Sequence, residues 1–247
     1  MKKNEAGWWK AMIYITGDTH GDIKRFRNLE SKGIVLNEDD YLIVCGDFGF
    51  IYFDDDKEQE RLDELEKKPF KILWIDGNHE NFDAINRYDV EEWNGGKIHR
   101  IRKNILHLMR GQVFNIEGKK IFTMGGAYSI DRYRREENVR YWKAELPSKE
   151  EYDEASKNLE ANDFKVDIII SHTAPKELIL KRLVLHPDSR DGELTGFLEW
   201  VMYECEFKKW YFGHWHIDKE MEIGIKIKYE YKTKSFRALL NDVVKAE

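Results

Sequence analysis

The sequence contains little that would build a disulfide framework or cross a membrane. Its 247 residues include two cysteines, Cys45 and Cys205, which stand far apart and form neither a C-x-x-C pair nor a disulfide pattern. No apolar run approaches the roughly 18 residues that span a bilayer, and residues 1–7 contain no apolar signal core. We therefore expect a cytoplasmic protein whose two thiols are reduced packing residues.

An excess of positive charge is also missing. The formal net charge is -6, so the chain has no global basic field with which to bind extended nucleic acid. A local patch would be needed even for a short oligonucleotide. Apolar strands are spread over the whole length without repeats or low-complexity linkers, which predicts one domain over residues 1–247, with residues 1–10 as a weakly ordered N-terminal extension.

Three apolar runs in the first half of the chain predict buried strands that end in metal-binding residue types. The runs cover residues 12–15, 41–45 and 70–75, and helical patterns at 22–32 and 54–68 connect them. The side chains that follow the three runs are Asp18 and His20, Asp47, and Asn78 and His79. Three such strand–helix units predict a parallel sheet with a ligand site beyond the carboxyl ends of its strands.

The second half repeats this arrangement after a change of character. Short runs between residues 97 and 126 predict antiparallel strands that extend the sheet or start a second one. Residues 128–147 are polar without an apolar period and predict a long surface loop of functional type, and a capping box at Ser148 and Glu151 predicts a helix to about residue 162. Further strands are predicted at 166–170, at 209–212 and at 221–231, and the first two end in His172 and in His214 and His216. Helical patterns near 175–184 and at 192–206 lie between the first two of these strands.

Each of these strand ends alone has a structural explanation. Asp47 would serve as a helix cap, His172 as a core histidine and residues 77–80 as a turn. Five such ends in one chain are hard to produce by packing alone, and five of the eight histidines lie at them. The remaining histidines and two nearby acids are expected to be ordinary strand, loop or first-turn helix residues: His99, His107, His186, Asp22 and Glu80.

In order, the blocks are D-x-H at 18–20, G-D at 46–47, G-N-H-E at 77–80, the histidine at 172 and G-H-x-H at 213–216. This series resembles that of the calcineurin-like metallophosphoesterases, and in form it is nearest to the serine/threonine protein phosphatase branch. The blocks span residues 17–216. The resemblance implies an α/β fold with mixed α+β character, in which a two-sheet β-sandwich is flanked by helices in four layers, and a two-metal centre on one rim.

The resemblance also implies roles for single residues. Asp18, His20 and His216 would hold one metal, Asn78, His172 and His214 the other, and Asp47 would bridge them. Oxygen and imidazole ligands suit manganese, with iron, zinc, nickel or magnesium as alternatives, and the lack of cysteine ligands argues against a closed structural zinc site. Two divalent ions roughly 3.5 to 4 Å apart would activate a shared water. The neighbouring His79 would protonate the leaving oxygen or stabilise the transition state.

One block departs from the protein phosphatase pattern. Gly46-Asp47 is followed by Phe48-Gly49-Phe50, where that branch has an aspartate and an arginine. A carboxylate that orients His79 and an arginine that binds phosphate are therefore missing from their usual place. Asp22 or Asp76 is a candidate for the carboxylate. Candidates for the phosphate contact are the loop residues Arg132, Arg134 and Arg135, for which a solvated charge run is the alternative.

These features predict a phosphoester hydrolase with a dinuclear metal centre and a metal-activated water. We expect a phosphomonoesterase acting on a phosphorylated small molecule, a phosphopeptide or a nucleotide. The alternatives are a phosphodiesterase acting on nucleotides or short nucleic acid, and an inactive scaffold of the same fold that binds proteins. A scaffold has no use for seven ligands and an acid. No pattern in the sequence indicates an oligomeric state.

Overall fold

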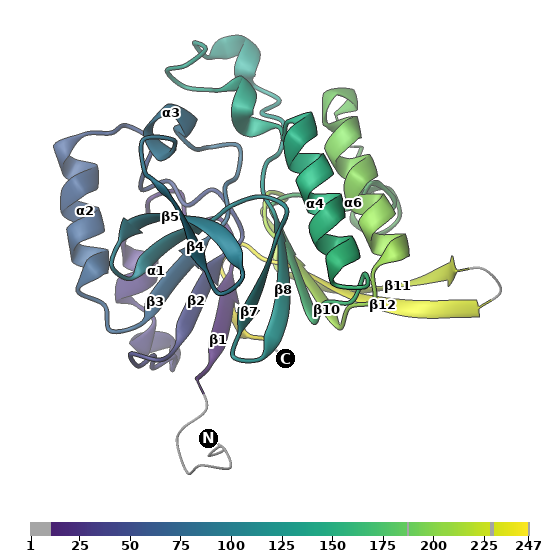
Figure 1. Cartoon of the computed structure of the whole chain (residues 1–247). Coiled ribbons are helices and arrows are strands. Elements are labelled where there is room, and N and C mark those ends of the chain that lie inside the picture. Colours follow the sequence, from purple (N-terminus) through teal and green to yellow (C-terminus); the bar gives the residue numbers. More distant parts are fainter. Residues whose placement is uncertain (1–10, 187, 228–229, 247) are drawn as a thin grey trace.

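Two mixed β-sheets lie face to face between layers of helices (Figure 1). The computed structural model describes residues 11–186, 188–227 and 230–246, so the N-terminal extension predicted for residues 1–10 lies outside the described residues. Within them, one sheet has seven strands in the order β13-β1-β2-β3-β6-β5-β4, and the other has six in the order β11-β12-β10-β9-β8-β7. The predicted two-sheet sandwich flanked by helices is confirmed.

In the first sheet, β1, β2, β3 and β6 are parallel, and β13, β5 and β4 run antiparallel to their neighbours. The short parallel strands are apolar on both faces because both faces are covered, and β2 is buried at every position. The strands are β1 Ile13–Thr16, β2 Tyr41–Val44, β3 Lys71–Trp74, β4 Val90–Trp93, β5 Gly96–Arg102, β6 Ile105–Leu108 and β13 Val243–Lys245.

In the second sheet, β8, β9, β10 and β12 are parallel, with β7 and β11 antiparallel at the two edges. The antiparallel runs predicted between residues 97 and 126 were expected to extend the sheet or to start a second one. β5 and β6 extend the first sheet, together with β4, which was not predicted, and β7 and β8 lie in the second sheet. The strand predicted over 221–231 is instead a hairpin of two strands. The strands are β7 Gln112–Ile116, β8 Lys119–Met124, β9 Ile168–Ser171, β10 Lys209–Phe212, β11 Lys219–Ile227 and β12 Glu230–Ala238.

Helices cover the outer faces of the sheets, with α1 to α3 on the first and α4 and α6 on the second (Figure 1). Three apolar clusters fill the spaces between the four layers. The predicted capping box opens α4, where Ser148 Oγ accepts from Glu151 N at 3.3 Å and Glu151 Oε2 accepts from Ser148 N at 2.7 Å. The helices are α1 Lys24–Arg27, α2 Asp56–Glu66, α3 Phe82–Ile85, α4 Lys149–Ala161, α5 Lys176–Leu178 and α6 Gly192–Glu204.

Two predicted helices are shorter than expected. The pattern at 22–32 forms α1 and a separate 3₁₀ turn, Glu30–Lys32, which ends at Gly33 with φ +76°. The pattern at 175–184 forms α5 and a π-helical turn, Ile179–Leu183. Among the described residues, no helix has the length and apolarity required to cross a membrane.

Candidate metal centre

The first predicted group of metal ligands comes together at one rim of the sandwich. Asp18 and His20 follow β1 of the first sheet, and His216 follows β10 of the second. His216 Nε2 lies 3.2 Å from Asp18 Oδ2 and 3.3 Å from His20 Nε2. One ligand atom from each residue lies within 4.8 Å of the others. This spacing allows a single cation to contact all three side chains.

The second predicted group lies beside the first. His172 Nε2 is 3.1 Å from Asn78 Oδ1 and 3.4 Å from Asp47 Oδ1, and the ring centroid of His214 is 5.1 Å from that of His172. The other oxygen of Asp47, Oδ2, is 3.9 Å from His20 Nδ1 in the first group. The carboxylate of Asp47 therefore faces both groups, which is the position that a bridging ligand requires.

The backbone at several of these residues is unusual. A positive φ is uncommon outside glycine and gathers at functional sites, because the rest of the fold must hold it in place. Four of the seven predicted ligands have one: His20 (46°), Asp47 (49°), His214 (64°) and His216 (50°).

Glycines beside the ligands allow the strand ends to approach one another closely. A Cβ atom added at Gly77 would lie 2.1 Å from Asp47 Oδ1, and one added at Gly213 would lie 2.1 Å from Asp18 Oδ1. No side chain fits at either position without displacing a ligand. The glycines of the sequence blocks thus serve the packing of the carboxylates as well as the turns.

The protonation states of two buried candidate ligands, His214 and Asp47, suit a cation. Burial, together with the neighbouring His172, lowers the pKa of His214 to about 3, so this imidazole is neutral. Burial alone would raise the pKa of Asp47, but the imidazoles of His172, His79 and His20 lower it. His172 Nδ1 lies 2.8 Å from Cys45 O and donates to it, which leaves Nε2 as the metal-facing nitrogen. Neutral imidazoles and ionised carboxylates are the forms that bind divalent metals.

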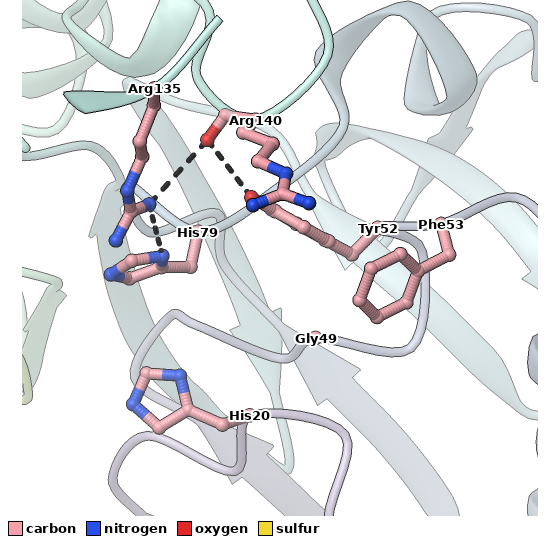
Figure 2. A pocket seen from close by; sticks show the side chains of 7 residues that line it. All are labelled: His20, Gly49, Tyr52, Phe53, His79, Arg135 and Arg140. Atoms are coloured by element: carbon pink, nitrogen blue, oxygen red, sulfur yellow. Dashed lines mark hydrogen bonds between the residues drawn. The ribbon is translucent and has the colours of Figure 1, made fainter. Parts of the chain in front are cut away.

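The predicted catalytic residue His79 is held by an arginine and not by an acid. Arg135 Nη1 donates to His79 Nδ1 at 2.9 Å (Figure 2). On its other side, Arg135 Nη2 is paired with Asp131 Oδ2 at 2.6 Å. The expectation that Asp22 or Asp76 orients His79 is therefore wrong. Asp22 instead accepts from a backbone N–H at the start of α1, and Asp76 belongs to a buried network behind the site.

Of the three predicted phosphate-binding arginines, only Arg135 lines a described cavity at the site. Arg132 is paired with Glu145 and lies 4.0 Å over the ring of Tyr128. Arg134 lies over Tyr133 at the exposed end of the loop. Arg132 turns inward because the fully buried carboxylate of Glu145 requires a cationic partner.

The loop at 128–147 also orients a predicted ligand. Asn78 Nδ2 donates to Ser129 Oγ at 3.0 Å, which turns Asn78 Oδ1 toward His172. Ser129 N in turn donates to Glu145 Oε1 at 3.0 Å. Part of this predicted surface loop is therefore interior, since Ser129 is 2% exposed and Glu145 is 0% exposed.

A buried network supports the turn that carries Asn78 and His79. Asp76 Oδ2 accepts from Arg110 Nη2 at 2.6 Å and from Nε at 2.8 Å, and Asp76 Oδ1 is 3.3 Å from His107 Nε2. His107 Nδ1 is 3.0 Å from His99 Nδ1. These two histidines, expected to be ordinary strand residues, extend the network. Burial would raise the pKa of Asp76, but Arg110 and His107 hold it well below its usual range.

Glu80 also differs from expectation. It is 0% exposed, and its carboxylate accepts from Phe48 N at 2.7 Å and from Gly49 N at 3.4 Å. It therefore holds the loop that follows Asp47 and is not a first-turn helix acid. Burial, with the nearby charge of Asp47, raises the pKa of Glu80 well above its usual value.

Sequence reasoning missed three residues that support the site: Arg110, Ser129 and Asp131. The polar composition of residues 128–147 indicated a functional loop, but no spacing identifies which of its side chains face inward. Arg110 follows β6 without any neighbouring motif.

Two cavities meet at the pair of His79 and Arg135. One, of about 440 Å³, contains the predicted ligands Asp47, Asn78 and His214. The other, of about 460 Å³, is lined by His20, Gly49, Tyr52, Phe53, His79, Arg135 and Arg140 (Figure 2). The site is thus open to a small molecule on two sides.

The donor set fits hard or borderline divalent cations, because it consists of carboxylate and amide oxygens and imidazole nitrogens. The two cysteines are buried, and no thiol is among the predicted ligands. This composition, with candidate ligands from both sheets and His79 beside them, suits a hydrolytic metal site.

The chain belongs to the calcineurin-like phosphoesterases, since the model of that family matches residues 11–218. It is therefore a phosphoester hydrolase. A phosphopantetheinyl hydrolase from Mycobacterium tuberculosis is similar in structure, with a TM-score of 0.50 and 17% identity over 93% of this chain and 88% of the other. A Staphylococcus aureus protein described as a 5′-nucleotidase has a TM-score of 0.47 and 13% sequence identity, over 92% of this chain and 48% of the other. No curated protein matches the sequence.

Proposed function

We propose that the protein is a phosphomonoesterase with two divalent metal ions per chain. The observation that carries the proposal is the carboxylate of Asp47, whose two oxygens face two separate groups of ligand atoms. Asp18, His20 and His216 would hold one ion, and Asn78, His172 and His214 the other. Manganese is the proposed metal, with iron, zinc, nickel or magnesium as alternatives. When bound, the ions supply an activated water and neutralise charge on the phosphoryl oxygens.

His79 serves as the general acid in this proposal. A guanidinium can only donate, so His79 Nδ1 accepts from Arg135 and the proton of the neutral ring is on Nε2. That proton is available to the leaving oxygen as its bond to phosphorus breaks. His79 N also donates to Asp47 Oδ1 at 2.8 Å, so the proposed acid and the proposed bridging carboxylate are joined by a direct hydrogen bond.

Arg135 has a second role in the proposal. Its guanidinium lines both cavities at the site, and a planar fork of N–H groups binds phosphoryl oxygens well. Asp131 fixes the guanidinium from the other side. The cationic guanidinium of Arg135 at this position favours a dianionic monoester over a singly charged diester, and this is the reason for preferring a phosphomonoesterase.

Two alternatives remain for comparison. A phosphodiesterase acting on nucleotides would use the same ligands, and the second cavity would then hold the second ester group. An inactive scaffold would need neither the positive φ angles at four ligands nor a buried network behind Asn78. The free buried thiols of Cys45 and Cys205 favour a reducing compartment, in agreement with the cytoplasm.

The test is hydrolysis by the manganese-loaded protein. We expect phosphate release from alkyl monoesters at a rate at least about tenfold above that from the matching diesters. Asp47→Asn should reduce kcat by about 10³ or more, because the bridging charge is lost. The matched control is Asp39→Asn, which changes an exposed acid far from the site and should leave kcat unchanged. Faster cleavage of diesters would favour the phosphodiesterase, and no cleavage of either would favour the scaffold.

A further inference from the structure

The two cavities that meet at His79 and Arg135 differ in charge. The cavity on the metal side carries Asp131, Asp188 and Asp191 in addition to Asp47. The cavity on the other side has no carboxylate among its described lining residues and has two arginines. We name this second cavity the cationic cavity. An anionic leaving group is attracted to the cationic cavity, because the described lining of this cavity holds two arginines and no carboxylate.

One wall of the cationic cavity is aromatic and exposed. Phe53 is 69% exposed, and its ring meets that of Tyr52 edge to face at 5.1 Å. Figure 2 shows both side chains on the side of the cavity opposite His79. An exposed ring facing an open cavity can stack a flat group from a ligand.

The backbone around Phe53 is firmly held. The buried carboxylate of Glu58 accepts from Tyr52 N at 3.0 Å and from Asp54 N at 2.7 Å, on either side of Phe53. Asn81 Nδ2 donates to Tyr52 O at 3.1 Å. The exposed ring is therefore presented by a fixed turn, which lowers the ordering cost of binding a ligand.

A cation without a carboxylate partner lies across the cavity from the metal ligands. The carbonyl oxygen of Arg140 accepts from Tyr52 Oη at 2.9 Å and from Arg135 Nη1 at 3.4 Å, so its backbone is fixed. Its guanidinium makes no ion pair with any described residue. Arg140 and Phe53 line the same cavity (Figure 2). A free guanidinium next to an aromatic wall suits a phosphate attached to a planar group.

We propose that the substrate is a nucleoside that carries two separate phosphate groups. The cationic cavity would bind the leaving group, which is the nucleoside with its second phosphate. The base would stack on Phe53, the second phosphate would pair with Arg140, and the scissile phosphate would lie at His79 and Arg135. The volume of about 460 Å³ falls within the range of small-molecule sites. This inference rests on the proposed function, because it assigns the substrate class of the same site.

The reaction balances as a simple hydrolysis. The bond between phosphorus and the nucleoside oxygen breaks, a water oxygen forms the new bond to phosphorus, and the leaving oxygen receives the proton from His79. The products are inorganic phosphate and a nucleoside monophosphate. A phosphotyrosine peptide also offers a ring, but its ring carries the scissile ester directly and has no second phosphate for Arg140.

The test compares three phosphate esters that differ only in the leaving group: ribose 5-phosphate, adenosine 5′-monophosphate and adenosine 3′,5′-bisphosphate. We expect kcat/KM to rise by about tenfold with the base and again by about tenfold with the second phosphate. In Phe53→Leu the ratio of kcat/KM for adenosine 5′-monophosphate to kcat/KM for ribose 5-phosphate should fall about tenfold. In Arg140→Gln the ratio of kcat/KM for adenosine 3′,5′-bisphosphate to kcat/KM for adenosine 5′-monophosphate should fall about tenfold.

A control variant and a binding measurement complete the test. Tyr133→Leu removes another exposed ring, 72% exposed, from outside both cavities and should leave both ratios unchanged. Calorimetry should show that adenosine 3′,5′-bisphosphate binds about tenfold more weakly to Phe53→Leu and to Arg140→Gln than to the unaltered chain.

Several results would overturn the inference. Equal kcat/KM for the three esters, equal effects of Tyr133→Leu and Phe53→Leu, or faster cleavage of a phosphotyrosine peptide would each exclude a nucleotide subsite while leaving the phosphomonoesterase intact. Binding that is weakened by both variants, without cleavage of any ester, would support the subsite and contradict the proposed function instead.

Discussion

Arg135 Nη1 lies 2.9 Å from Nδ1 of His79, and the same guanidinium is bound on its far side by Asp131. A cation at this position acts differently from the carboxylate expected there. Burial, with a contribution from Arg135, lowers the pKa of His79, and the contact fixes the neutral tautomer with its proton on Nε2. The general acid of the proposed reaction is thus a neutral imidazole that an arginine holds in place.

The first prediction concerns Arg135. Replacing it by Gln should lower kcat on monoesters by about 10², because the contact to His79 and a phosphate-binding fork are lost together. Arg135→Lys should recover only part of the activity, since one ammonium cannot reach Asp131, His79 and the phosphate at once. Steady-state kinetics with Arg27→Gln as an exposed control measure the effect. Full activity in Arg135→Lys would show that charge alone is sufficient.

The second prediction separates acid catalysis from binding. His79→Gln should reduce kcat by about 10² to 10⁴ for alkyl phosphates, whose leaving oxygen needs a proton. The loss should be much smaller for p-nitrophenyl phosphate, whose phenolate leaves unaided. A plot of rate against the pKa of the leaving alcohol should therefore become steeper in the variant. An equal loss across the whole series would assign His79 to phosphate binding alone.

The third prediction concerns the contact between Ser129 and Asn78. In Ser129→Ala the amide of Asn78 loses the acceptor that orients it, and metal affinity should fall about 10- to 100-fold. Titration of metal-free protein with Mn²⁺ under calorimetry measures this without any substrate. Ser156→Ala in α4, where the hydroxyl bonds only a carbonyl of its own helix, is the matched control. Unchanged affinity in Ser129→Ala would mean that the loop does not support the ligand.

The fourth prediction concerns the buried pair of Asp76 and Arg110. Removing one partner leaves an uncompensated buried charge, so Arg110→Met should lower the free energy of unfolding by about 3 to 5 kcal/mol. The double variant with Asp76→Asn should regain part of this loss, because neither charge then remains. Urea unfolding of the four proteins completes the cycle. Additive losses would show that the two residues do not act as a pair.

The fifth prediction follows from His99. Burial, together with His107, lowers the pKa of His99 from its usual 6.5 to about 4. Between these two values the unfolded chain binds more protons than the folded chain, so stability should decrease as the pH falls from 6.5 to 4, by about 2 kcal/mol from this group. His99→Gln should show a correspondingly smaller decrease in urea unfolding across the same range. Identical pH dependence in the two proteins would contradict this assignment.

The sequence predicted most of the sandwich, and it predicted that the candidate ligand residues stand at the ends of apolar strands, because both depend on local patterns. Each ligand lies within a few residues of the end of an apolar strand, and parallel strands bring such ends to one rim. The strands β4, β12 and β13 were not predicted, and each of them contains at least one charged residue. An apolar run does not mark them.

The contacts that support the site were not accessible to the same reasoning. Arg135 and His79 are separated by 56 positions, Ser129 and Asn78 by 51, and Arg110 and Asp76 by 34. No periodicity links residues so far apart, and the loop at 128–147 has none of its own. The three arginines predicted to bind phosphate, out of four in that loop, looked equivalent in sequence, and only the position of buried Glu145 separates Arg132 from Arg135.

The most direct test of the account is the metal content of the purified chain after loading with Mn²⁺ and dialysis, measured by inductively coupled plasma mass spectrometry. The account predicts about two ions per chain, about one in His216→Ala and in His172→Ala, and fewer than one in Asp47→Asn. One ion or less in the unaltered chain, or two ions retained in Asp47→Asn, would contradict a centre bridged by this carboxylate.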